Sequence, residues 1–114
     1  MTAALISSEK VEGTDVYGPD RDKIGSIDHL MIDKSSGHVG YAIMKFGGFL
    51  GLGQSAYPLP WGKLSYDNNL DGYITDVTEE QVKNAPDYDE DSFKNRDWET
   101  KTHDHYQTRY YWEH

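Results

Sequence analysis

The 114-residue sequence contains no cysteine and has little positive charge. The absence of cysteine excludes a disulfide framework, a thiolate zinc site, an iron–sulfur cluster and a cysteine nucleophile. Lysine and arginine total 11 against 20 aspartates and glutamates, which gives a net charge of -9 at pH 7. Because binding to a phosphate backbone needs clustered basic residues, we expect no direct contact with nucleic acid.

Long hydrophobic runs are also missing. The longest nearly uncharged stretch lies between Phe46 and Gly62, and it is too short and too rich in glycine for a membrane-spanning helix. The first ten residues, MTAALISSEK, lack the basic start and the apolar run of a secretory signal. We therefore expect a cytoplasmic protein without direct membrane insertion.

Glycine and negative charge are unevenly distributed along the chain. All 11 glycines lie between Gly13 and Gly72, whereas most of the acidic residues lie after residue 60. The end of the chain combines acidic with aromatic side chains, and disordered acidic tails are usually poor in aromatics. We predict a domain at residues 5–86 and a C-terminal extension at residues 87–114 that docks either on this domain or on a second subunit.

Short runs of β-branched and aromatic residues alternate with turn signals in the first part, which is typical of a small all-β domain. Residues 24–32 form an alternating strand that ends at a hairpin loop, residues 33–37. Residues 39–46 follow as the partner strand, with one face of small side chains that suits a curved or closely packed sheet.

Two prolines mark the next predicted strand, residues 56–61. Pro58 and Pro60 lack the N–H that a sheet ladder needs, so this strand is expected at a sheet edge or at the rim of a barrel. The ring of Trp61 is expected to close one end of the barrel, with its indole N–H bonded to a carbonyl oxygen.

A further turn, strand and helix complete the predicted domain. Residues 67–72 form the turn and residues 73–77 the strand that follows it. Thr78 caps a short helix with acidic residues in its first turn, and Pro86 ends it. Five or six short strands, one helix after the last strand and no βαβ spacing predict a small β-barrel.

The glycine-rich segment at residues 47–53 invites comparison with a phosphate-binding loop. No Lys-Ser/Thr pair and no helix-forming sequence follow it, as that motif requires. We interpret it instead as a loop between strands, in which Phe49, Leu50 and Leu52 form an exposed protein-binding patch.

Two patterns suggest metal ligands. Residues 67–72 match the first half of a calcium loop, but Thr78 stands where a bidentate glutamate is needed, so a hairpin turn is the better interpretation. His103 and His105 would share one face of an extended segment, but two imidazoles do not complete a zinc site, so surface histidines are expected. We expect no metal and no cofactor.

No arrangement of nucleophile, base and orienting group stands out. Serine, histidine and carboxylates are present, but no spacing such as G-x-S-x-G joins them. We therefore predict no catalytic residues and no enzymatic activity.

The order and spacing of four segments resemble the PRC-barrel domain family, which is named for the cytoplasmic part of the photosynthetic reaction centre H subunit. They are GTDVY at 13–17 with KIGSID at 23–28, ID at 32–33 with GHVGYA at 37–42, GGFLGLG at 47–53, and YPLPW at 57–61 with Leu64. Residues 80–86 and the aromatic end at 110–112 are similar to those of small stand-alone bacterial members. Structural roles are expected for Gly25, Gly37, Pro58, Pro60 and Trp61.

The resemblance implies a compact β-barrel that serves as an adaptor or assembly module. Family members occur in reaction-centre assembly and, beside a second domain, in a ribosome maturation factor. The resemblance transfers no catalytic residue, because the family has none to transfer.

We predict a non-enzymatic protein-binding adaptor that self-associates. A homodimer would bury Tyr110, Tyr111 and Trp112, because aromatic side chains are common anchors of interfaces. Two alternatives stay open. The protein is an adaptor in RNA or ribosome metabolism that binds basic ribosomal proteins, or a small metal- or ligand-binding protein that uses His103 and His105 or the turn at 67–72.

Overall fold

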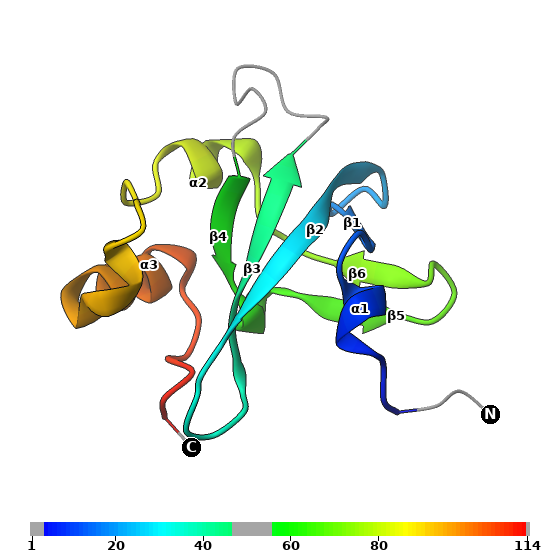
Figure 1. Cartoon of the computed structure of the whole chain (residues 1–114). Coiled ribbons are helices and arrows are strands. Elements are labelled where there is room, and N and C mark those ends of the chain that lie inside the picture. Colours follow the sequence, from blue (N-terminus) through cyan, green and yellow to red (C-terminus); the bar gives the residue numbers. More distant parts are fainter. Residues whose placement is uncertain (1–3, 47–55, 114) are drawn as a thin grey trace.

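The computed structural model describes residues 4–46 and 56–113, in which six strands form one sheet (Figure 1). The strand order is β4-β3-β2-β1-β6-β5, with β1 parallel to β6 and all other neighbours antiparallel. The strands are β1 (Asp15–Tyr17), β2 (Lys23–Ile32), β3 (Val39–Phe46), β4 (Ala56–Pro60), β5 (Ser65–Asp67) and β6 (Gly72–Ile74). The helices are α1 (Ser8–Val11), α2 (Glu79–Lys83) and α3 (Arg96–Tyr106), with 3₁₀ turns η1 (Trp61–Lys63) and η2 (Ser92–Lys94).

This arrangement confirms the prediction of a small β-dominated domain with short strands and a short helix after the last one. The sheet does not close. In the part of the chain that the structure describes, β4 and β5 end the strand order and share no ladder. None of the helices in that part is long and apolar enough to cross a membrane.

The β2–β3 hairpin is the largest strand pairing, and its loop forms as the sequence predicts. The carboxylate of Asp33 accepts hydrogen bonds from the backbone N–H of Ser35 at 3.1 Å and from the hydroxyl of Ser36 at 2.9 Å. Gly37 ends the loop at a φ of 81°, in the left-handed region that glycine tolerates best. Local chemistry alone therefore explains this turn.

Gly25 lies where β2 is paired on both sides, with β1 and with β3. A Cβ at this position would collide with the backbone carbonyl oxygen of Lys45. We expect Gly25→Ala to lower the free energy of unfolding by about 1–3 kcal/mol, the usual cost of forcing extra atoms into a packed site. Urea denaturation measures this effect, with Ser26→Ala as the matched control in the same strand. Equal urea denaturation midpoints for Gly25→Ala and Ser26→Ala would contradict the close approach of the Lys45 carbonyl oxygen to Gly25.

The second predicted turn and the predicted helix also form. Asp67 accepts hydrogen bonds from the backbone N–H groups of Asn69 and Leu70, at 2.8 and 3.1 Å, so its carboxylate folds a turn. Thr78 caps α2 through reciprocal hydrogen bonds with Gln81, at 3.2 and 2.8 Å. Short polar side chains at element ends fold these segments because they satisfy the free backbone groups.

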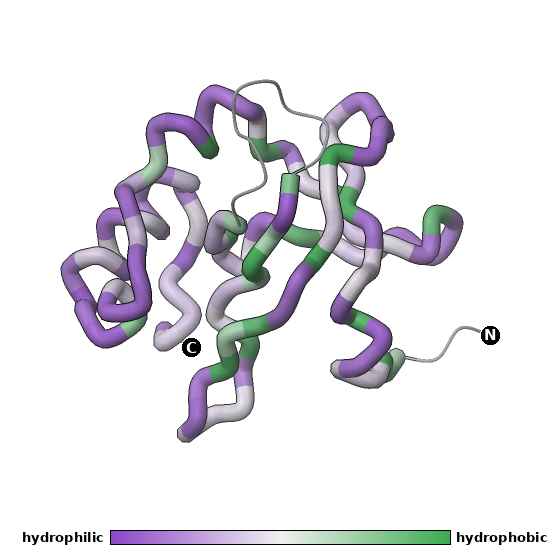
Figure 2. The backbone as a smooth tube through the Cα atoms, turned by 45° about the horizontal axis from the view of Figure 1, so that its top comes forward, coloured by the Kyte–Doolittle hydropathy of each residue, from purple (hydrophilic) through white to green (hydrophobic). Residues whose placement is uncertain are grey.

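Strand β3 is buried on both faces. Its inner face contributes Ala42 and Met44 to the main core, which also includes Val16, Ile27, Leu59 and Val77. Its outer face contributes Tyr41 and Ile43 to a second cluster with Trp98 of α3. Figure 2 shows the hydrophobic stretches on the central strands, whereas the surrounding turns and helices are mostly hydrophilic.

The helix α3 corrects the prediction for the C-terminal extension, which treated residues 103–105 as extended chain. Asn95 caps the helix, because its side-chain oxygen accepts from the backbone N–H groups of Asp97 and Trp98 at 2.9 and 3.4 Å. The left-handed residue Gln107 ends it. The helix packs on the outer face of β3, so the extension is part of the folded body.

Trp61 differs in part from its predicted role. It begins η1 after the last residue of β4, and its ring packs edge-on against Tyr73 with centroids 5.3 Å apart. The side chain is half-buried against the main core. The expected bond from the indole N–H to a carbonyl is not formed within residues 4–46 and 56–113, because a half-buried N–H can be satisfied by solvent.

Candidate protein-interaction site

Tyr41 is the centre of the contact between the extension and the sheet. Its side chain is 2% exposed. Four rings surround it with centroids 5.3–5.7 Å away, and they belong to Phe93, Trp98, His103 and Tyr111. Edge-to-face contacts of this kind add to the free energy of burial, so the extension is held by aromatic packing.

Glu99 supplies the polar part of the same contact. Its Oε1 accepts hydrogen bonds from the hydroxyls of Tyr41 at 3.0 Å and Tyr111 at 2.5 Å. Its Oε2 lies 3.4 Å from Nε of Arg96. Burial, together with the nearby Glu99 carboxylate, raises the pKa of both tyrosines, so they remain protonated donors at neutral pH.

The three aromatic residues predicted to bind a partner lie against their own chain. Trp112 is placed between Tyr110, whose ring is parallel to it at 4.8 Å, and the guanidinium of Arg96, whose carbon lies 3.7 Å from the ring centroid. Tyr110 also donates a hydrogen bond from its hydroxyl to Asp104 at 2.6 Å. The extension therefore packs on the sheet of its own chain. The other predicted binding residues, Phe49, Leu50 and Leu52, lie outside the described residues.

The two tail histidines do not form the arrangement that the sequence suggested. They are two positions apart on a helix, so they cannot share a face, and His103 is buried with 1% exposure. Burial lowers the pKa of His103, and its Nδ1 donates to the backbone oxygen of Glu99 at 2.7 Å. His105 places Nε2 2.6 Å from the backbone oxygen of Gln81. Residues 4–46 and 56–113 hold no group of three side chains suited to a metal ion.

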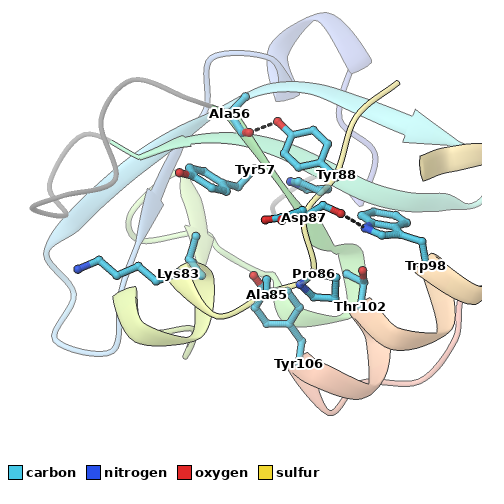
Figure 3. A pocket seen from close by; sticks show the side chains of 12 residues that line it. Ala56, Tyr57, Lys83, Ala85, Pro86, Asp87, Tyr88, Trp98, Thr102 and Tyr106 are labelled. Atoms are coloured by element: carbon cyan, nitrogen blue, oxygen red, sulfur yellow. Dashed lines mark hydrogen bonds between the residues drawn. The ribbon is translucent and has the colours of Figure 1, made fainter. Parts of the chain in front are cut away.

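A hollow of about 570 Å³ lies beside β4, between the end of α2 and the helix α3 (Figure 3). We call it the β4 hollow. Its lining residues are Ala56, Tyr57, Pro58, Val82, Lys83, Ala85, Pro86, Asp87, Tyr88, Trp98, Thr102 and Tyr106. The sequence did not indicate this site, because its walls come from three separate segments and one of them is the helix that was not predicted.

Two hydrogen bonds hold one wall of the β4 hollow in place. The indole N–H of Trp98 donates to the backbone oxygen of Asp87 at 2.9 Å. The hydroxyl of Tyr88 donates to the backbone oxygen of Ala56 in β4. Figure 3 shows both bonds bridging the segment at residues 87–88 to its neighbours. The wall is therefore pre-formed, with its polar groups already engaged.

Two hydroxyls in the β4 hollow have no such partner. Thr102 is 1% exposed, and its Oγ1 makes no hydrogen bond within the described chain. Tyr106, one helical turn later on α3, also has no hydrogen-bond partner for its hydroxyl among the described residues. Burial raises the pKa of Tyr106, so its hydroxyl keeps its proton. Both hydroxyls are neutral. Each can donate one hydrogen bond to a guest and accept one from it.

The outer edge of β4 borders the same hollow. The backbone oxygen of Ala56 points away from β3 toward Tyr88, and strand alternation places the backbone of Pro58 and Pro60 on the same outer edge. This edge lacks two N–H donors, so it does not favour the addition of another strand. A guest is expected to be recognised by the side chains of the hollow.

Comparisons with known proteins match the chain to one family model and to solved structures. The model of the PRC-barrel domain matches residues 5–82. No curated protein matches the chain. Among solved structures, the chain is similar to a putative 16S ribosomal RNA processing protein, RimM, from Pseudomonas aeruginosa, at 22% identity and a TM-score of 0.43. The match covers 66% of this chain and 45% of that protein, so the chain spans less than half the length of RimM.

Proposed function

The chain belongs to the PRC-barrel domain family, and from this premise we propose that it is a non-enzymatic adaptor that binds a protein partner through the β4 hollow. The match ends at residue 82, and most of the hollow is built from residues beyond that point. Most of the proposed binding site therefore lies outside the part of the chain that the family model matches.

The observation that carries the proposal is the buried Thr102 hydroxyl in a hollow large enough for a guest. A buried hydroxyl without a hydrogen bond costs about 1–3 kcal/mol, a cost that valine of nearly the same shape would avoid. The volume of about 570 Å³ falls in the range of binding sites, which is roughly 300–1,000 Å³. A guest that bonds to Thr102 would remove the cost of the unpaired hydroxyl.

The polar groups of the β4 hollow favour binding over catalysis. The hydroxyl of Tyr106 is held protonated by burial, so it does not act as a base at neutral pH. The two charged residues of the lining, Lys83 and Asp87, are exposed to solvent. These features support recognition by shape and hydrogen bonds.

The proposal does not depend on self-association. The predicted dimer anchors Tyr110, Tyr111 and Trp112 are half-buried against their own chain, which leaves less of their surface for a second copy. A homodimer and the narrower role as an adaptor in RNA or ribosome metabolism both stay predictions.

Thr102→Val tests the proposal because its two expected effects have opposite directions. We expect the free energy of unfolding to rise by about 1 kcal/mol, because the unpaired hydroxyl is removed. We also expect capture of the partner from the native host in a crosslinking pull-down to fall by about fivefold, because a hydrogen bond to the partner is lost. The matched control is Thr100→Val, on the same helix but outside the lining.

If Thr102→Val is more stable than the original protein and still loses its partner, unfolding cannot explain the loss of binding. Should Thr102→Val and Thr100→Val capture the same proteins in equal amounts, the β4 hollow is not the binding site.

A further inference from the structure

We infer that the partner presents to the β4 hollow a basic peptide segment with an apolar or aromatic anchor side chain. This inference rests on the proposed function and goes further by stating the chemistry of the occupant.

The segment that borders the hollow is strongly acidic. Six carboxylates and one lysine lie between Glu79 and Asp91. The ε-amino group of Lys83 lies 3.2 Å from Glu79, and Asp91 is paired with Lys94 at 3.7 Å. The carboxylates left without an ion pair among the described residues are Glu80, Asp87, Asp89 and Glu90, all of them exposed. Lysine or arginine side chains of a partner would complement this charge.

The lining of the hollow fits a large apolar side chain. Tyr57, Tyr88 and Trp98 present aromatic rings, and Pro58 and Pro86 present apolar rings beside them. Aromatic and aliphatic side chains that enter such pockets are the usual anchors of protein interfaces. Asp87 lies on the lining, and Glu80, Asp89 and Glu90 belong to the same chain segment, so basic residues beside the anchor match this charge.

The two hydroxyls of α3 fit the backbone of an extended peptide. Thr102 and Tyr106 are neutral, and each provides one donor and accepts at its lone pairs. A peptide backbone offers both an N–H and a C=O to such groups. Figure 3 shows the two side chains rising from α3 toward Ala85 and Pro86, on the side of the hollow away from Tyr88.

Binding of labelled peptides to the full chain, measured by fluorescence anisotropy, tests the inference. The first peptide carries lysine and arginine on both sides of one tryptophan. The second has serine in place of the tryptophan, and the third has aspartate and glutamate in place of the basic residues. We expect the basic tryptophan peptide to bind at least about tenfold more tightly than each of the others, and more weakly as salt is raised.

Asp87→Lys is the matching change in the protein. The backbone oxygen of Asp87, and not its carboxylate, accepts the bond from Trp98, so the wall of the hollow should persist. We expect the variant to weaken binding of the basic tryptophan peptide by about tenfold. Asp20→Lys is the control, because it makes the same change of charge at an exposed residue outside the lining.

Equal binding of the three peptides, preference for the acidic peptide, or equal effects of Asp87→Lys and Asp20→Lys would overturn the inference. If one of these peptide results were found and Thr102→Val still lost the host partner in the pull-down, the chemistry inferred for the peptide would be refuted. The proposed function would still be supported. Unchanged capture by Thr102→Val would refute the proposed function itself.

Discussion

Trp98→Ala should lower the free energy of unfolding by about 3–5 kcal/mol, the usual cost of truncating a buried tryptophan. Trp98 is buried between the rings of Tyr41 and Phe93. Its indole N–H also holds the backbone at Asp87, so the change removes a wall of the β4 hollow together with the contact to the sheet. Urea denaturation, monitored by circular dichroism, measures the decrease in the free energy of unfolding.

Trp112→Ala is the matched control for this prediction. Trp112 is half-buried and stacks on Tyr110 and Arg96 near the end of the chain. We expect it to cost about 1 kcal/mol, because a partly exposed ring loses less burial. A Trp98→Ala variant as stable as Trp112→Ala would show that α3 is not anchored on β3 in the way the structure shows.

Glu99→Ala should cost about 3 kcal/mol, because it leaves the buried Tyr41 hydroxyl and the half-buried Tyr111 hydroxyl without their common acceptor. The ion pair with Arg96 adds little, since the Arg96 side chain is 55% exposed. The measurement is the denaturation midpoint, combined with hydrogen exchange of the α3 amides.

Glu99→Gln distinguishes the hydrogen bonds from the charge. Its amide oxygen can still accept from both tyrosines, so we expect a cost of about 1 kcal/mol. If Glu99→Gln and Glu99→Ala had the same denaturation midpoint, the acceptor role of Glu99 would be refuted.

The sequence was sufficient where one short segment determines its own structure. The loop closed by Asp33, the turn at Asp67 and the cap at Thr78 depend on a side chain that bonds to the backbone within three residues. Pro58 and Pro60 likewise indicated an edge strand, because neither can donate to a ladder. Such features need no knowledge of the rest of the fold.

Helix α3 was missed because its buried face is largely polar. The buried positions are Trp98, Glu99, Thr102, His103 and Tyr106. A search for apolar periodicity finds only the first and last of these, although their spacing of three and four residues is helical. Glu99 is explained by a partner elsewhere in the fold, the Tyr41 hydroxyl, and His103 by the backbone oxygen of Glu99, whereas Thr102 has no partner among the described residues.

The β4 hollow could not be predicted from the sequence for a related reason. Its lining comes from residues 56–58, 82–88 and 98–106, which are brought together by tertiary contacts such as those of Tyr88 with Ala56 and of Trp98 with Asp87. The sequence indicated that the aromatic end of the chain would dock. It did not indicate that docking on the sheet of the same chain would create a hollow with an unpaired hydroxyl.

Photo-crosslinking from position 83 in the native host tests the central claim most directly. Lys83 lies on the lining and is exposed, so benzoylphenylalanine at this position would face a bound partner. The account predicts one crosslinked protein, joined through a segment with basic residues beside an apolar one, and its loss when Thr102→Val is added. The same crosslinks from exposed position 21, outside the lining, or crosslinks unchanged by Thr102→Val, would contradict it.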